Sequence, residues 1–164
     1  AGFLTSGGTL ANLTALLAAR AHGISQIGEH QKWTILVSEQ AHFCVERSAN
    51  TMGLGIQGIT KIPSDENYQI DLVALKEIHQ KVTDQGLKVM AVVGCACSTA
   101  TGSYDDLKRL SDFCKTHNYW FHVDGAHGAP TIFSKKYAYL LKGIERADSV
   151  VWDAHKMMMI PSLL

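Results

Sequence analysis

A lysine and an aspartate in the second half of the chain have the residue types needed for chemistry with an aldehyde cofactor. Lys156 ends the segment DAHK (153–156), and Asp124 is central in HVDGAH (122–127). A lysine amine can hold an aldehyde cofactor as a Schiff base. A carboxylate can keep a pyridinium nitrogen protonated, so that the ring accepts electrons. The pair therefore predicts a pyridoxal 5'-phosphate (PLP) enzyme, which also needs a phosphate cradle and a group that stacks on the ring.

The segment TSGGT (5–9) is the candidate phosphate cradle, because a stretch rich in helix formers follows it. Glycines let the backbone approach a ligand closely, and free N–H groups at a helix start attract phosphate. The hydroxyls of Ser6 and Thr9 could add hydrogen bonds. An ordinary capped turn would have the same composition. The segment is not a Walker loop, since no Gly-Lys-Ser/Thr follows the glycines.

His42 is the candidate stacking group, because an imidazole can lie on a flat heteroaromatic ring and also carry a proton. Ala126, close after Asp124, leaves room for such a ring. Each residue also has an ordinary structural interpretation: His42 as a buried histidine, and Asp124 as a turn residue. Lys156 precedes the apolar run MMMI (157–160), which predicts a desolvated, nucleophilic amine; a lysine that reaches out to solvent is the alternative.

A metal site is a rival interpretation of the segment around Asp124. His122, Asp124 and His127 are residue types that bind zinc or iron, and His122 and Asp124 would point to the same face of a strand. The spacing of Cys95 and Cys97 matches no common zinc site, and a metal would leave Lys156 without a role. Metal-dependent hydrolysis is therefore the weaker hypothesis.

Helix-like and strand-like segments alternate along the chain. Periodicity and composition predict helices at 11–20, 45–52, 72–85 and 106–117, and strands at 33–37, 89–93, 120–123 and 149–152. The strands lack alternation of apolar and polar residues, so both of their faces are buried. We therefore expect an α/β fold with three layers (α/β/α), a mostly parallel sheet and one domain.

The candidate residues follow these predicted strands. Ligands of open α/β sheets bind beyond the carboxyl ends of the strands. His42, Thr99, Asp124 and Lys156 each come after a predicted strand, and the glycine turn opens the first helix. The pattern predicts that these loops meet at one crevice.

Composition is that of an ordinary folded domain. The chain has 164 residues, of which 46% are hydrophobic and 18% charged, and its 15 basic residues balance 15 acidic ones. This balance argues against nucleic-acid binding, and no apolar run approaches the length of a membrane span. The four cysteines are few and irregularly spaced, which predicts reduced, buried thiols in a cytoplasmic protein. Because the chain begins AGF without methionine, we interpret it as a fragment of a longer protein.

The chain resembles the group II PLP-dependent amino-acid decarboxylases, which have the aspartate-aminotransferase-like fold (fold type I). The resemblance runs from residues 3–20 through AH (41–42), VER (45–47), ST (98–99), YD (104–105) and HVDGA (122–126) to HK (155–156). It implies that residues 1–164 form part of the large, cofactor-binding domain of a PLP-dependent transferase-like fold. The N-terminal arm, the mobile loop and the C-terminal small domain of the family would then lie outside this chain.

The resemblance also implies roles for individual residues. Lys156 corresponds to the Schiff-base lysine, Asp124 to the partner of the pyridine nitrogen, and His42 to the stacked histidine. The further cofactor-binding positions are Gly8 and Thr9 at the phosphate, Thr99 near the ring's edge oxygens, Ala126 on the opposite ring face, His155 near the phosphate, and Asp153, which is Asn or Asp in relatives. Phe43 and Cys44 depart from the family, because many relatives have small hydroxyl residues there.

The expected function is decarboxylation of an L-amino acid to an amine and carbon dioxide, by a cytoplasmic homodimer that binds neither nucleic acid nor membrane. The fragment alone would be inactive. Another fold type I enzyme, such as an aminotransferase or a lyase, would use the same lysine and aspartate. A truncated scaffold without turnover is a further alternative. The DAHK segment (153–156) favours an acidic or diamino aliphatic substrate.

Overall fold

A parallel five-stranded sheet forms the centre of the molecule. The computed structural model describes residues 1–161, so the last three residues of the predicted domain lie outside the described part. The strands lie in the order β2-β1-β3-β4-β5, and each neighbouring pair is parallel. Their bounds are β1 Trp33–Ser38, β2 Ile59–Ile62, β3 Lys88–Cys95, β4 Trp120–Asp124 and β5 Ser149–Val151.

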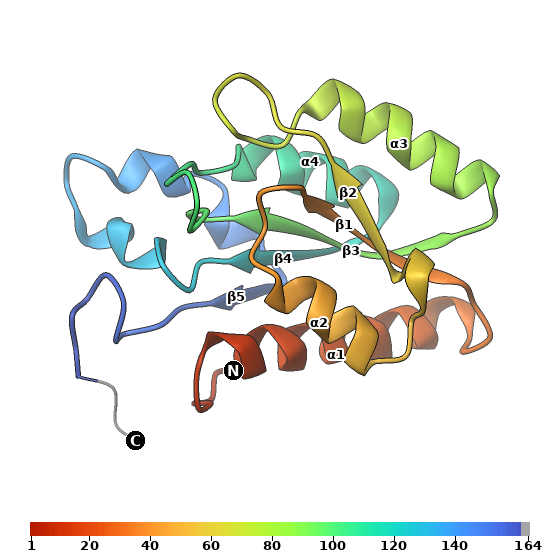
Figure 1. The fold of residues 1–164 in the computed structure, drawn as a ribbon, viewed down its shortest axis with the longest axis horizontal. Helices are drawn as coiled ribbons and strands as arrows, with labels where there is room; N and C mark the ends of the chain where they lie inside the picture. Colours follow the sequence, from red (N-terminus) through yellow and green to blue (C-terminus); the bar gives the residue numbers. More distant parts are fainter. Residues whose placement is uncertain (162–164) are drawn as a thin grey trace.

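Helices cover both faces of this sheet, which confirms the predicted three layers (Figure 1). Helices α1 (Gly8–Ile27) and α2 (Cys44–Thr51) lie on one face, and α3 (Leu72–Asp84) and α4 (Leu107–His117) lie on the other. Along β1, Ile35 and Val37 pack toward α1 and α2, whereas Leu36 packs into the cluster under α3 and α4. Both faces of each central strand are buried, which explains the unbroken apolar runs.

The first helix is longer than the sequence predicts. It begins at Gly8 rather than at residue 11 and continues past residue 20 to Ile27. Gly23 lies inside this helix and does not end it. The Trp33 ring packs directly against Gly23, so a Cβ at this position would lie only 2.9 Å from the ring. Tertiary packing thus outweighs the low helix propensity of glycine.

Strand β2 and the short 3₁₀ helices were not predicted. Strand β2 is a four-residue edge strand that contains a lysine and is mostly half-buried or exposed, so it lacks the apolar run of the central strands. The 3₁₀ helices are η1 (Ile56–Gly58), η2 (Ala129–Phe133), η3 (Ala138–Leu141) and η4 (Ile144–Arg146). Such single turns have too little periodicity to be read from sequence.

The buried carboxylate of Asp105 fixes the carboxyl end of β3. Its two oxygens accept the backbone N–H groups of Ile70 and Cys95, each at 2.7 Å. Burial raises the pKa of Asp105 to about 6, although the two backbone hydrogen bonds act in the opposite direction and lower it. The Ser98 hydroxyl donates to the Gln40 carbonyl at 3.2 Å, which ties the loop after β3 to the loop after β1. These bonds hold two of the predicted site loops together.

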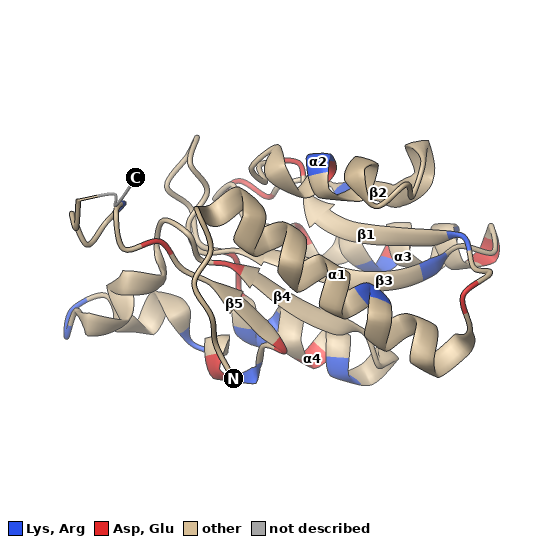
Figure 2. Cartoon of the chain, turned by 90° about the horizontal axis from the view of Figure 1, so that it is seen from below, with Lys and Arg blue, Asp and Glu red and all other residues tan. Residues whose placement is uncertain are grey.

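Charge is distributed unevenly over the helices (Figure 2). Helix α1 has one residue with a permanent charge, Arg20, while Leu10 and Leu17 are each 45% exposed on its surface. Charged residues recur along the shorter α3 and α4. None of the helices described between residues 1 and 161 has the length and apolar character needed to cross a membrane.

Candidate cofactor-binding site

One open cleft lies at the carboxyl ends of the strands, as predicted. It has a volume of about 690 Å³, within the range of small-molecule sites. All nine residues predicted from the sequence line it: Gly8, Thr9, His42, Thr99, Asp124, Ala126, Asp153, His155 and Lys156. They come from the start of α1 and from the loops after β1, β3, β4 and β5. The sheet therefore brings together side chains that are up to 148 positions apart.

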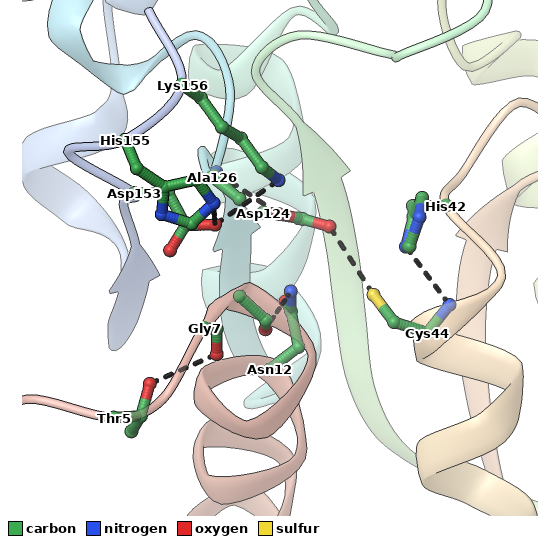
Figure 3. A network of polar contacts seen from close by, with 11 residues as sticks. Thr5, Gly7, Asn12, His42, Cys44, Asp124, Ala126, Asp153, His155 and Lys156 are labelled. Atoms are coloured by element: carbon green, nitrogen blue, oxygen red, sulfur yellow. Dashed lines mark hydrogen bonds and ion pairs between the residues drawn. The ribbon is translucent and has the colours of Figure 1, made fainter. Parts of the chain in front are cut away.

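Lys156 forms an ion pair inside the cleft. Its Nζ lies 3.3 Å from Oδ2 of Asp153, and Nε2 of His155 lies 3.9 Å from the same oxygen. Figure 3 shows the lysine side chain reaching toward Asp153 and Asp124. The Asp153 side chain is 9% exposed, and that of Lys156 is 34% exposed. The pair holds the amine in the cleft while leaving it accessible to a ligand.

The predicted desolvation of Lys156 by the following methionines is wrong. Met157 and Met159 are 40% and 87% exposed, because β5 ends at Val151 and the chain then leaves the sheet. The environment of the amine is set by Asp153 and His155 instead.

Asp124 ends β4 and is 8% exposed. Its Oδ1 accepts the backbone N–H of Ala126 at 3.2 Å, and its Oδ2 lies 4.0 Å from Sγ of Cys44. Burial, together with the nearby carboxylate, raises the pKa of Cys44 to about 12. The thiol is therefore neutral at physiological pH and directs a weak donor at Asp124.

His42 stands on the α2 side of the cleft (Figure 3). Its Nδ1 accepts the backbone N–H of Cys44 at 3.3 Å. This bond fixes the ring at the start of α2 and leaves Nε2 as the nitrogen that carries the proton in the neutral form. Phe43, one of the two departures from the family pattern, is 56% exposed and its ring centre lies 4.2 Å from that of His42.

Helix α1 begins directly at the cleft. No described side chain caps its N-terminus, where Gly7 has φ 146°, so the first backbone N–H groups are left for a ligand. A Cβ on Gly8 would lie 2.9 Å from Oδ2 of Asp153 and 3.2 Å from Cβ of Ala126. Only glycine lets the helix start approach the ends of β4 and β5 this closely.

The sequence reasoning missed several residues of the cleft. Ser6 and Gly7, from the predicted phosphate cradle, also line it; those that line it without a predicted PLP role are Leu10, Asn12, Leu13, Cys44, Cys95, Cys97, Ser98 and His127. Asn12 gave a usable signal, because it is a polar residue inside an apolar stretch of α1 and is 1% exposed. All four cysteines in residues 1–161 are free thiols; Cys44, Cys95 and Cys114 are buried as predicted, whereas Cys97 is partly exposed.

The metal hypothesis finds no cluster to support it. Among the described residues, no group of three or more His, Cys, Asp and Glu side chains is arranged to hold a metal ion. His122 is fully buried, and its nitrogens are engaged by Asn12 and Ser149 at 2.7 and 2.8 Å. His127 lines the cleft and is exposed.

The residues of the cleft fit PLP. The uncapped start of α1 suits a phosphate, and the accessible amine of Lys156 suits an aldehyde. Asp124 offers a carboxylate oxygen that has the neutral Cys44 thiol beside it, at 4.0 Å. The buried Oδ2 of Asp153, which also faces Gly8, pairs with the Lys156 amine at 3.3 Å and so holds that amine in the cleft. These donors and acceptors are the ones that a phosphorylated pyridine aldehyde requires.

Comparison with known proteins agrees with this chemistry. Residues 1–162 match the pyridoxal-dependent decarboxylase conserved domain. The chain is 38% identical over 160 residues to an aromatic-L-amino-acid decarboxylase of Bacillus atrophaeus, covering 98% of this chain and 33% of that protein. It is 35% identical over 177 residues to an aspartate 1-decarboxylase of Aliivibrio fischeri, covering 98% of this chain and 32% of that protein.

Solved structures show the same fold. The glutamate decarboxylase domain of a diaminobutyrate-pyruvate transaminase and L-2,4-diaminobutyrate decarboxylase from Vibrio parahaemolyticus superposes with a TM-score of 0.89 at 34% identity, covering 94% of this chain and 36% of that chain. Mouse CSAD in its apo form gives a TM-score of 0.91 at 29% identity, over 97% of this chain and 35% of that one. This chain spans about a third of the length of these relatives. The match over residues 1–162 shows that the chain belongs to the pyridoxal-dependent decarboxylase family, as its sequence predicted.

Proposed function

We propose that the intact protein decarboxylates an L-amino acid to an amine and carbon dioxide, with PLP held by Lys156. One observation carries the proposal: Lys156, Asp124 and the uncapped start of α1 line the same cleft, although they come from distant parts of the sequence. Family membership supports the same reaction class. When bound, PLP would accept into its ring the electron pair that remains after the bond between Cα and the carboxylate breaks.

Lys156 and Asp124 have the two central roles in this proposal. The Lys156 amine would hold the aldehyde group of the cofactor and give it up to the substrate amine. Asp153, whose Oδ2 lies 3.3 Å from Nζ, would keep the released amine close to the site. Asp124 would hold a proton on the pyridine nitrogen, because an anionic carboxylate favours the charged form of that ring.

The remaining residues would position the ring and the phosphate. His42, held by its bond to the Cys44 N–H, would support one face of the ring, and Ala126 would pack on the opposite face. Thr9 and Gly8 would present backbone N–H groups to the phosphate, with His155 beside it. Thr99, exposed on the loop after β3, would reach the edge of the ring.

The test is an absorbance spectrum of the intact protein, before and after borohydride, followed by peptide mapping. The proposal predicts a visible band that borohydride removes, with the mass of the cofactor fixed on Lys156. No band after addition of PLP would reject it, as would attachment to another lysine. Product analysis then tests the reaction, because decarboxylation yields an amine and carbon dioxide, whereas transamination yields a keto acid.

The substrate is proposed only as an L-amino acid. The names of the relatives include aromatic amino acids, aspartate and 2,4-diaminobutyrate. They support no narrower class, and the preference for an acidic or diamino aliphatic substrate stays a prediction. Competition assays with one amino acid of each kind would decide it.

We also propose that the intact protein is a cytoplasmic homodimer. The resemblance to dimeric decarboxylases supports the assembly, and the four free thiols are compatible with a reducing compartment. Analytical ultracentrifugation of the intact protein at micromolar concentration would show a dimer; a monomer that binds PLP fully would reject the assembly.

A further inference from the structure

A chain of buried hydrogen bonds runs from the sheet to the start of α1. Trp120 Nε1 donates to the Ser149 hydroxyl oxygen at 2.8 Å, and the Ser149 hydroxyl lies 2.8 Å from Nδ1 of His122. Nε2 of His122 lies 2.7 Å from Oδ1 of Asn12, whose Nδ2 donates to the carbonyl of Gly8 at 2.9 Å. His122 and Asn12 are 0% and 1% exposed, so protein groups alone satisfy these atoms.

The donors and acceptors allow one direction along this chain. The indole N–H of Trp120 can only donate, so the Ser149 oxygen accepts it and the hydroxyl hydrogen is free to point at His122. The amide nitrogen of Asn12 donates to Gly8, so its oxygen faces His122 and must accept. The Asn12 oxygen thereby fixes a hydrogen on Nε2 of His122, and a neutral ring then accepts the Ser149 hydroxyl on Nδ1.

Burial agrees with this assignment. Desolvation lowers the pKa of His122 to about 4, and the carboxylate of Asp124, which opposes that shift, does not overcome it. The ring therefore stays neutral through the physiological range.

The last bond of the chain fixes the peptide that joins Gly8 to Thr9. In a planar trans peptide, the carbonyl of one residue and the N–H of the next point in opposite directions. Holding the Gly8 carbonyl along the helix therefore directs the Thr9 N–H out of the helix start, toward the cleft that both residues line. Gly8 has little freedom to shift, because it already packs against Asp153 and Ala126.

We infer that His122 is a positioning residue, which transmits the orientation of the sheet to the turn at the start of α1 and so sets the phosphate-binding N–H groups. Ser149 and Asn12 act with it as the neighbouring links. The inference deepens the proposed function, since it rests on PLP phosphate binding at this turn. His122 itself does not line the cleft, nor does Ser149, so neither touches the ligand.

The test compares PLP with pyridoxal, which lacks the phosphate, by titration of the apo form of the intact protein. Ser149→Ala removes the link between Trp120 and His122 at a distance from the cleft. We expect a three- to tenfold weaker affinity for PLP, roughly the loss of one buried hydrogen bond, and an unchanged affinity for pyridoxal. Ser149→Thr keeps the hydroxyl and is expected to restore the affinity for PLP.

Thr34→Val is the matched control. Thr34 is fully buried in the same sheet, and its hydroxyl bonds only to that of Thr60, at 2.8 Å, among the described residues. Its loss should change neither affinity. An unchanged affinity of folded Ser149→Ala for PLP would overturn the inference, and so would an equal loss for PLP and pyridoxal.

A second measurement does not depend on PLP. Nitrogen-15 spectra of the imidazole groups at pH 6 should show His122 as a neutral ring protonated on Nε2. A charged ring, or a hydrogen on Nδ1, would overturn the chain of hydrogen bonds even if Ser149→Ala did not fold. Failure of the wild-type protein to bind PLP would instead reject the proposed function, while the spectrum still decides the inference.

Discussion

The two faces of strand β4 have different roles, since one packs in the apolar core and the other carries residues of the site. Phe121 and Val123 point into the apolar cluster under α3 and α4, where they are 1% and 0% exposed. Trp120, His122 and Asp124 point to the α1 side, where they form the hydrogen-bonded chain and the carboxylate of the site. Successive residues of one strand thus serve the fold and the site in turn, because side chains alternate across a sheet.

The two faces are stabilised by different kinds of interaction. On the α4 face, Phe121 and Val123 contribute mainly through burial and shape, so a change there should cost stability and leave chemistry intact. The α1 face contains polar groups that are satisfied by specific partners, so a change there should alter the site first. Mutations on the two faces can therefore separate a loss of stability from a loss of function. The effects of mutating other cleft residues can be compared with these two.

The largest effect is expected at the site. Lys156→Ala should lower turnover of the intact protein roughly a thousandfold or more, because no other described amine replaces the attachment point. Turnover, absorbance and circular dichroism together check this. Lys142→Ala is a suitable control, since this lysine does not line the cleft. Retention of the borohydride-sensitive band in Lys156→Ala would contradict the assignment.

The second largest effect is expected on the face of β4 that packs under α3 and α4. Phe121→Ala should lower the free energy of unfolding by about 3–5 kcal/mol, because it leaves a cavity in a fully buried cluster. Denaturant unfolding measures the loss. The affinity of the folded fraction for PLP should stay at the wild-type value; a large drop would show that the two faces are not separable.

Asp124→Asn keeps the shape of the side chain, and its oxygen can still accept the N–H of Ala126. The neutral amide cannot hold a proton on the pyridine nitrogen, so we expect turnover to fall about 100-fold with little change in stability. Paired measurements of turnover and urea midpoint test this. Full activity would remove Asp124 from the proposed mechanism.

Stability should depend on pH through two buried groups of opposite sign. The pKa of His122 is lowered to about 4 in the fold, so the unfolded state takes up a proton first and stability is lost as pH falls from about 6.5. The pKa of Asp105 is raised to about 6, so the folded state keeps a proton that the unfolded state has lost. That group costs stability as pH rises from about 4 to 6.

Asp105→Asn removes the second contribution. Its urea midpoint should therefore rise more steeply between pH 4 and 6 than that of the wild type. Parallel slopes for the two proteins would show that Asp105 does not hold its proton in the fold.

The smallest effect is expected for Cys44→Ser. The neutral thiol is only a weak donor to Asp124 at 4.0 Å, and a hydroxyl there preserves a donor of similar size. Turnover should change by less than about threefold. A larger change would mean that this departure from the family pattern tunes the carboxylate directly.

Much of the fold and the set of cleft residues could be predicted from local patterns. The apolar runs of β1, β3 and β4 indicated a doubly covered parallel sheet, and parallel strands collect the residues that follow them at one edge. Strand β2 and the 3₁₀ helices between β4 and β5 were not predicted, because such short segments have little periodicity. The exposure of Met157 and Met159 was also missed, since composition does not reveal where a chain leaves its sheet.

The sequence by itself determined the family, the layered fold and the residue types available for PLP chemistry, because these follow from motif order and hydrophobic pattern. Only the tertiary structure decided which partners those residues have. It pairs Lys156 with Asp153, places a thiol beside Asp124, and turns His122 from a candidate metal ligand into a link between Ser149 and Asn12. Hydrogen bonds between distant residues depend on distances of a few tenths of an ångström, which only the packed helices and strands define.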